Sequence, residues 1–120
     1  MVILDSNVFI YLANGTLQPH VVADVDVAHA SITKIETLGF WQIRANELLL
    51  LEALFSESYN LALTDTVVDR AVKLRQSQNI SLGDAIIAAT ALEHDYELWT
   101  ANEEDFVKVE GLHIYNPLSH

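Results

Sequence analysis

The chain opens on the stretch Val2-Ile3-Leu4-Asp5-Ser6-Asn7, in which three apolar residues are followed at once by three polar ones. A short, continuous apolar run is typical of a strand that is buried on both faces, as strands are in a parallel sheet. The polar residues carry side chains that cap helices, and we expect a helix over residues 8–13. This stretch therefore predicts a buried strand that runs directly into a helix.

The alternation of strand and helix continues through the chain. We expect further strands at residues 25–31, 61–63, 98–100 and 112–114, and further helices at 31–39, 46–55, 64–76 and 81–94. The helix at 46–55 carries leucines nearly all round, which predicts that it is buried or meets a partner. Strands that alternate with helices predict a parallel sheet covered on both faces. We therefore expect one α/β domain over residues 1–120, a three-layer α/β/α fold with a parallel sheet of four to five strands.

Composition limits the classes of protein that this chain can represent. Hydrophobic residues make up 51% of the 120 residues, which is enough for a core. The 17 acidic and 6 basic residues give a net charge of −11, which argues against a basic groove and against a membrane-surface protein. The absence of cysteine excludes disulfides and thiolate sites. Because no leader pattern or membrane-spanning run is evident, we expect a cytoplasmic protein without a membrane partner.

Four acidic residues stand where strands are expected to end or helices to begin. Asp5 ends the first strand, and Glu36 lies in the first turns of the helix after the second strand. Asp84 lies in the first turn of the helix at 81–94, and Asp105 follows the fourth strand. In a doubly wound parallel sheet such positions meet at the edge formed by the carboxyl ends of the strands. The sequence therefore predicts an acidic site at that edge.

Each of these acids, taken alone, also has a structural explanation. Ser81-x-x-Asp84 and Thr33-x-x-Glu36 have the spacing of capping boxes, and Asn102-x-x-Asp105 looks alike. The conjunction of four acids favours a functional site, because two carboxylates ~5 Å apart repel by about 3 kcal/mol at an effective dielectric of 20. A cation relieves that repulsion, and an all-oxygen site suits Mg²⁺ or Mn²⁺ rather than zinc. Such a site activates water and neutralises a phosphodiester transition state.

Four segments, in this order, resemble the motifs of PIN domains. They are Ile3-Leu4-Asp5-Ser6-Asn7-Val8, Ser31-Ile32-Thr33-x-x-Glu36, Leu82-Gly83-Asp84-Ala85 and Leu98-Trp99-Thr100-x-Asn102-x-x-Asp105-Phe106. The size of the chain and the spacing of the motifs are most similar to the VapC-type ribonuclease toxins of toxin–antitoxin pairs. The resemblance implies a PIN-like fold and a Mg²⁺- or Mn²⁺-dependent endoribonuclease. It also implies an RNA substrate, a cognate antitoxin protein as partner, and a homodimer.

The resemblance further implies roles for individual residues. Asp5, Glu36 and Asp84 would bind the metal, and Asp105 matches the fourth acid, although other members place that acid at the position of Asn102. The residues expected to support these ligands are Ser6, Asn7, Thr100 and Asn102. Lys34 and Arg44 are expected nearer the site and are the candidates for contact with RNA. By contrast, the cluster Arg70, Lys73 and Arg75 is expected to form a solvated helix face.

Other readings of the same chain differ in class. A PIN-fold protein that no longer cuts RNA and acts only as an RNA- or protein-binding module is the main alternative. A phosphoacceptor receiver domain needs an acidic pair after the first strand and a lysine near a late strand end, but no second acid follows Asp5 and no late Lys-Pro occurs. A P-loop or dinucleotide fold is excluded because the four glycines form no phosphate-binding cluster.

Overall fold

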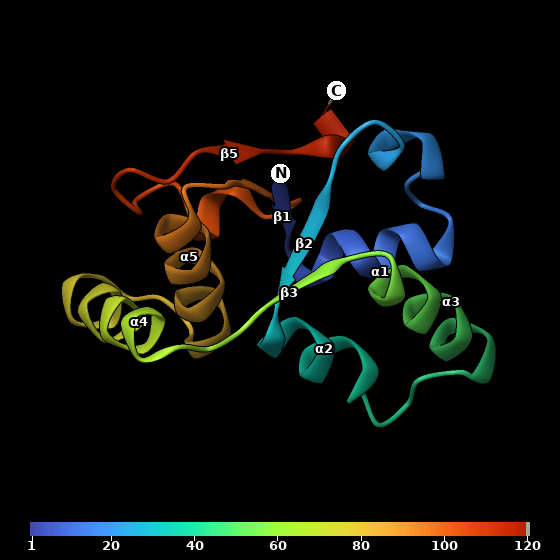
Figure 1. The fold of residues 1–120 in the computed structure, drawn as a ribbon, viewed down its shortest axis with the longest axis horizontal. Coiled ribbons are helices and arrows are strands. Elements are labelled where there is room, and N and C mark those ends of the chain that lie inside the picture. Colours follow the sequence, from blue (N-terminus) through green and yellow to red (C-terminus); the bar gives the residue numbers. More distant parts are fainter. Residues whose placement is uncertain (120) are drawn as a thin grey trace.

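A parallel sheet of five strands runs through the middle of the molecule, with helices on both of its faces (Figure 1). The computed structural model describes residues 1–119. The strands are β1 (Val2–Leu4), β2 (Val27–Ala30), β3 (Tyr59–Leu61), β4 (Glu97–Trp99) and β5 (Ile114–Tyr115). They lie in the order β3-β2-β1-β4-β5, and every neighbouring pair is parallel. The predicted three-layer fold is confirmed, and the opening stretch of the chain forms the central strand.

Five α-helices connect these strands. They are α1 (Ser6–Asn14), α2 (Ser31–Leu38), α3 (Ala45–Ser56), α4 (Asp65–Ser77) and α5 (Leu82–His94). Short 3₁₀ turns add η1 (Pro19–Val22), η2 (Glu103–Asp105) and η3 (Pro117–Ser119). Figure 1 shows α4 and α5 on one side of the sheet and α1 and α3 on the other. No helix within residues 1–119 is both long enough and apolar enough to span a membrane.

The central strand supplies a side chain to each of the two cores. Ile3 is fully buried in the core beneath α4 and α5, together with Leu98 and Phe106. Leu4 points to the other face and packs in the core beneath α1 and α3, where Phe9 belongs to the same cluster. Successive residues of a strand alternate between faces, so burial of both follows from helices on both sides. Each such aliphatic side chain contributes about 1.5–3 kcal/mol through burial.

Edge strands and one helix differ from what the sequence predicts. The third strand was expected at 61–63 and the fifth at 112–114, but they lie at Tyr59–Leu61 and Ile114–Tyr115. An edge strand has one neighbour instead of two, so a short apolar run does not fix its register. In α3, burial is confined to Leu51 and Phe55, whereas Leu49 is 68% exposed. Part of α3 therefore faces outward within this chain, and of the two expectations for this helix, burial or contact with a partner, contact with a partner stays a prediction for the exposed part.

We predict that Ile3→Ala lowers the free energy of unfolding by about 2–5 kcal/mol, because it removes a fully buried side chain from the central strand. Urea denaturation followed by circular dichroism measures this change. The matched control is Val107→Ala, where the side chain is 68% exposed, and it should stay within about 0.5 kcal/mol of wild type. Equal losses in the two variants would contradict the packing described above.

Candidate metal centre

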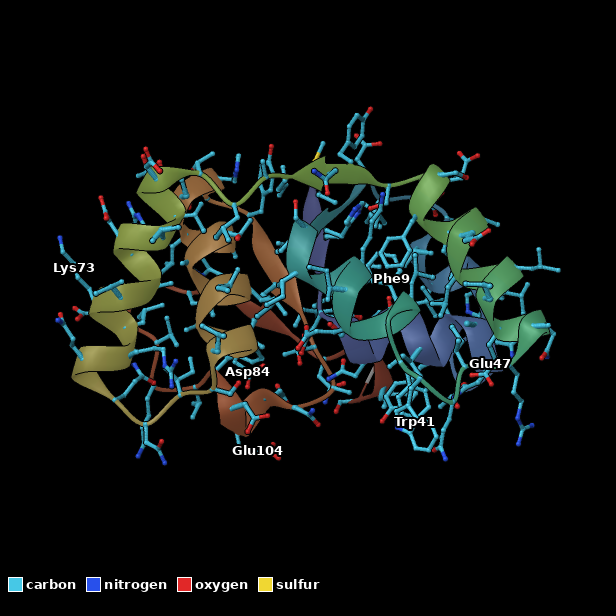
Figure 2. The ribbon with its side chains drawn as sticks, turned by 90° about the horizontal axis from the view of Figure 1, so that it is seen from below. Phe9, Trp41, Glu47, Lys73, Asp84 and Glu104 are labelled. Atoms are coloured by element: carbon cyan, nitrogen blue, oxygen red, sulfur yellow. The ribbon has the colours of Figure 1, made fainter. Side chains whose placement is uncertain are left out.

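The four predicted acids reach one edge of the sheet from four elements. Asp5 directly follows β1, Glu36 lies on α2, Asp84 lies in the first turn of α5, and Asp105 ends η2. Strands β2, β1 and β4 are parallel neighbours, so their carboxyl ends share this edge. Helices α2 and α5 pack against each other. In Figure 2, Asp84 lies next to η2, where Glu104 is labelled, and both residues line one cavity.

Asp5 is the buried member of the group, with 5% of its surface exposed. Its Oδ1 accepts a hydrogen bond of 2.8 Å from the backbone N–H of Ser6. Its Oδ2 accepts hydrogen bonds from Thr100 Oγ1 at 2.8 Å and from Asn7 Nδ2 at 3.2 Å. A carboxylate offers about four lone-pair sites, so three donors leave room for one further ligand. The carboxylate is thus held in place and can still coordinate an ion.

The loop after β4 is fastened to the turn after β1. The hydroxyl of Thr100 accepts a hydrogen bond from the backbone N–H of Asn102 at 3.0 Å, and Asn7 Oδ1 accepts one from the N–H of Ala101 at 3.2 Å. The side chain of Asn102 makes no capping bond to η2, so the capping box predicted at Asn102-x-x-Asp105 is wrong. Asn102 supports the site through its backbone N–H, which donates to Thr100. Whether Asn102 or Asp105 supplies the fourth ligand is not decided by these contacts.

Glu36 approaches the start of α5 because residue 83 is a glycine. The hydroxyl of Ser6 donates a hydrogen bond of 2.7 Å to Glu36 Oε1. A Cβ atom on Gly83 would stand 2.5 Å from Glu36 Oε2, closer than real Cβ contacts. Any larger residue at position 83 would therefore push Glu36 away from the turn that carries Asp84. The absence of a side chain at Gly83 therefore lets Glu36 lie close to the helix turn that carries Asp84.

The charges of these acids oppose one another. Burial is the largest cause that raises the pKa of Asp5, and the charges of Glu36 and Asp105 raise it further, against the hydrogen bonds from Thr100 and Ser6. Burial, followed by the charge of Asp5, raises the pKa of Asp84 to about 6. Neither of the two ion pairs formed within residues 1–119 involves any of the four acids. The group therefore carries negative charge that no basic side chain compensates.

The donor atoms fit a hard divalent cation. The site offers only carboxylate, hydroxyl and amide oxygens, which suit Mg²⁺ or Mn²⁺. As the side chains stand, no three His, Cys, Asp or Glu residues of the described chain lie close enough together to hold one ion. Asp5 is already fixed, whereas Glu36 and Asp105 are exposed and have room to turn. The uncompensated charge and the free lone pair on Asp5 are what such an ion would use.

Helix capping explains the positions of some of the four acids and does not explain the others. Asp5 is the N-cap of α1, and the Oγ of Ser81 caps α5 by accepting from the N–H of Asp84 at 3.2 Å. The capping box predicted at Thr33-x-x-Glu36 is wrong, because α2 begins at Ser31 and Thr33 lies inside it. Its Oγ1 is buried and has no hydrogen-bond partner among the described residues. Glu36 therefore has no capping role.

The two basic residues expected near the site have other neighbours. Lys34 Nζ lies 5.9 Å from the centre of the Phe55 ring, on the side of α2 that faces α3. Arg44 Nε lies 3.9 Å from Glu47 Oε1. Figure 2 shows Glu47 far from Asp84 along the long axis of the molecule. The structure does not bring Arg44 to the acids, and contact of either residue with RNA stays a prediction.

Comparisons with known proteins agree with this architecture. A family model described as "PIN domain" matches residues 2–112. Ribonuclease VapC1 of Rickettsia felis is 30% identical over 92 residues, which cover 75% of this chain and 63% of that protein, so the chain matches less than two thirds of that relative. A chain in a toxin–antitoxin complex from Klebsiella pneumoniae is 26% identical, with a TM-score of 0.74 and 98% of each chain covered. A chain of VapBC2 from Rickettsia felis, bound to a promoter DNA fragment, has a TM-score of 0.82 at 19% identity, covering 97% of this chain and 98% of that one.

We predict that Asp84→Asn raises the melting temperature of the metal-free protein at pH 7.5. The folded-state pKa of about 6 lies above the ordinary value of 3.8, so the folded protein binds more protons between these values. Stability therefore falls as the pH rises from about 4 through 6, and the substitution removes that loss. Differential scanning fluorimetry in EDTA from pH 4.5 to 8 measures the effect.

The stabilisation by Asp84→Asn should shrink towards pH 4.5, where the wild-type carboxyl is protonated. Asp65→Asn, in the first turn of α4, is the matched control, because its carboxylate is exposed and lies outside the acidic group. A variant that is less stable than wild type at every pH would mean that Asp84 serves the helix start alone.

Proposed function

Since the chain belongs to the PIN domain family, we propose that it is a metal-dependent endoribonuclease that hydrolyses phosphodiester bonds of RNA at the four acids. The observation that carries the proposal is the gathering of Asp5, Glu36, Asp84 and Asp105 without a basic partner. A bound Mg²⁺ or Mn²⁺ would supply an activated water and neutralise the charge that develops on the phosphodiester. The name of the relative, Ribonuclease VapC1, points to the same reaction.

Burial and hydrogen bonds distinguish the residues that would bind the metal from those that orient them. Asp5, buried and held by three donors, is the fixed ligand around which the site is arranged. Thr100 and Asn7 hold its carboxylate in one orientation, which matters because a metal ligand that is free to turn binds more weakly. Ser6 directs Glu36 towards the site less tightly, through one hydrogen bond of 2.7 Å to an exposed carboxylate. We assign Ser6, Asn7 and Thr100 as positioning residues of this site.

We also propose that an antitoxin protein restrains the enzyme and that the chain forms a homodimer. One solved structure with the same fold, at 26% identity, is a toxin–antitoxin complex. The net charge of −11 favours a basic partner, because complementary charge speeds and orients association. Apolar side chains stand exposed on and between α2 and α3, where Ile35 is 71% and Trp41 is 85% exposed. That surface suits contact with another protein chain.

We predict that Asp5→Asn lowers kcat for Mg²⁺-dependent RNA cleavage by at least about 100-fold, since losing a residue that merely supports a ligand already costs about 10–100-fold. The assay uses tRNA, ribosomal RNA and a mixed-sequence single-stranded RNA, each with Mg²⁺, Mn²⁺ or EDTA. Asp65→Asn, which changes an exposed acid in the same way, should retain wild-type activity.

Circular dichroism shows whether Asp5→Asn still folds, which separates loss of the site from loss of the N-cap. Cleavage that persists in EDTA, or that is equal in wild type and Asp5→Asn, would contradict the proposal. Absence of cleavage on all three RNAs by folded wild-type protein would favour a PIN-fold module that only binds.

A further inference from the structure

Three of the six basic residues of this chain line one cavity. The cavity has a volume of about 530 Å³ and lies between α4, the C-terminal half of α5 and the segment at 108–110. Arg70 and Lys73 reach it from α4, and Lys108 from the segment that follows η2. Leu74 and Leu92 supply its apolar wall. We call this cavity the α4 groove.

A second cavity adjoins the α4 groove and is lined by two of the four acids. Its volume is about 850 Å³, and Asp84 and Asp105 line it. The two cavities share Ser77, Gln78 and Lys108 as wall residues. Among residues 1–119, Lys108 is the one basic residue that lines this second cavity. It therefore stands at the junction between the basic groove and the proposed site of cleavage.

The basic side chains of this groove differ in whether an acidic residue already pairs with them. Arg70 Nε lies 2.8 Å from Glu93 Oε2, so its charge is already compensated, and Glu110 adds one negative charge to the groove. Lys73 and Lys108 make no ion pair with any residue from 1 to 119. Figure 2 shows Lys73 extending from the outer side of α4. Two uncompensated ammonium groups thus mark a path that leads away from Asp84.

We propose that the RNA backbone passes from the acids over Lys108 and along the α4 groove to Lys73, with Lys108 as a positioning residue for a phosphate beside the scissile one. The inference rests on the proposed function and adds the direction of the substrate. A chain of net charge −11 repels RNA over most of its surface, so backbone phosphates need local cations. No aromatic residue of the described chain lines the groove, so the groove holds the backbone and does not read sequence.

This proposal replaces the expectation of a solvated face for part of α4. Arg70 and Lys73 line the groove, whereas Arg75 lines neither cavity. The sequence carried one signal for Lys108, which follows Asp105 by three residues and so stays near it. That signal is weak because a single lysine in a loop is common on any protein surface. Only the shape of the molecule joins Lys108 to Lys73.

The test measures binding separately from cleavage. Fluorescence anisotropy follows a labelled 20-nucleotide single-stranded RNA of mixed sequence in Mg²⁺, with all proteins carrying Asp84→Asn so that the RNA stays intact. Adding Lys108→Gln or Lys73→Gln should weaken binding about three- to tenfold at 50 mM salt and lower the slope of log K against log salt by about 0.7 each. Arg75→Gln on the same helix is the matched control and should leave both quantities unchanged.

A second readout uses the protein without Asp84→Asn. There, Lys108→Gln should raise KM for RNA cleavage several-fold and leave kcat within about twofold, as expected for uniform binding of substrate and transition state. A purely structural role for Lys108 would change the melting temperature and would not produce this split.

The outcomes separate this inference from the proposed function. RNA binding that depends on Lys108 and Lys73, in a protein that cleaves nothing, supports the groove and overturns the nuclease. Cleavage with unchanged KM in Lys108→Gln overturns the groove and leaves the nuclease standing. Undetectable RNA binding at 50 mM salt overturns the groove, as does binding of poly-glutamate, with the same dependence on Lys108, in place of RNA. The last result would assign the groove to an acidic protein.

Discussion

The rest of this site depends on the buried carboxylate of Asp5. It lies at the end of the central strand and forms no ion pair with a basic side chain of residues 1–119. Burying a charge is costly unless it is hydrogen-bonded, and three donors meet that need, two at the start of α1 and one directly after β4. One of them, Thr100, ties the end of β4 to the end of β1. The charges of Glu36 and Asp105 then make this position still less favourable for a charged carboxylate. Such an arrangement reduces the stability of the folded chain, and functional sites commonly do so.

The sequence predicted those parts of the molecule whose signals are local. Val2–Leu4 became the central strand because a buried parallel strand must be apolar throughout, and Ser81 begins α5 as its capping spacing indicates. Where the position of a side chain depends on residues distant in the sequence, the prediction from local spacing was wrong. Thr33 had the right spacing for a cap and lies inside a helix, and Lys34 turns towards α3, opposite to the direction that proximity in sequence to Glu36 suggested. Neither outcome is encoded within a few residues.

The net charge describes this molecule poorly, because the sign of the local charge differs from one part of the surface to another. The value of −11 argued against a basic groove, yet three of six basic residues line a single cavity. Folding concentrates those charges by packing α4 against α5 and bringing the segment at 108–110 beside them. An acidic surface elsewhere is compatible with an RNA substrate if the cations lie along its path, and it suits a basic protein partner as well.

Anomalous diffraction from crystals grown with Mn²⁺ tests directly whether the uncompensated acids bind a divalent cation. We expect a single strong peak at the edge of the sheet, beside the carboxylates of Asp5 and Asp84. Asp84→Asn crystals should lose or weaken that peak. A peak confined to exposed acids such as Glu103, or none at saturating Mn²⁺, would contradict the claim and leave Asp5 as the cap of α1 alone.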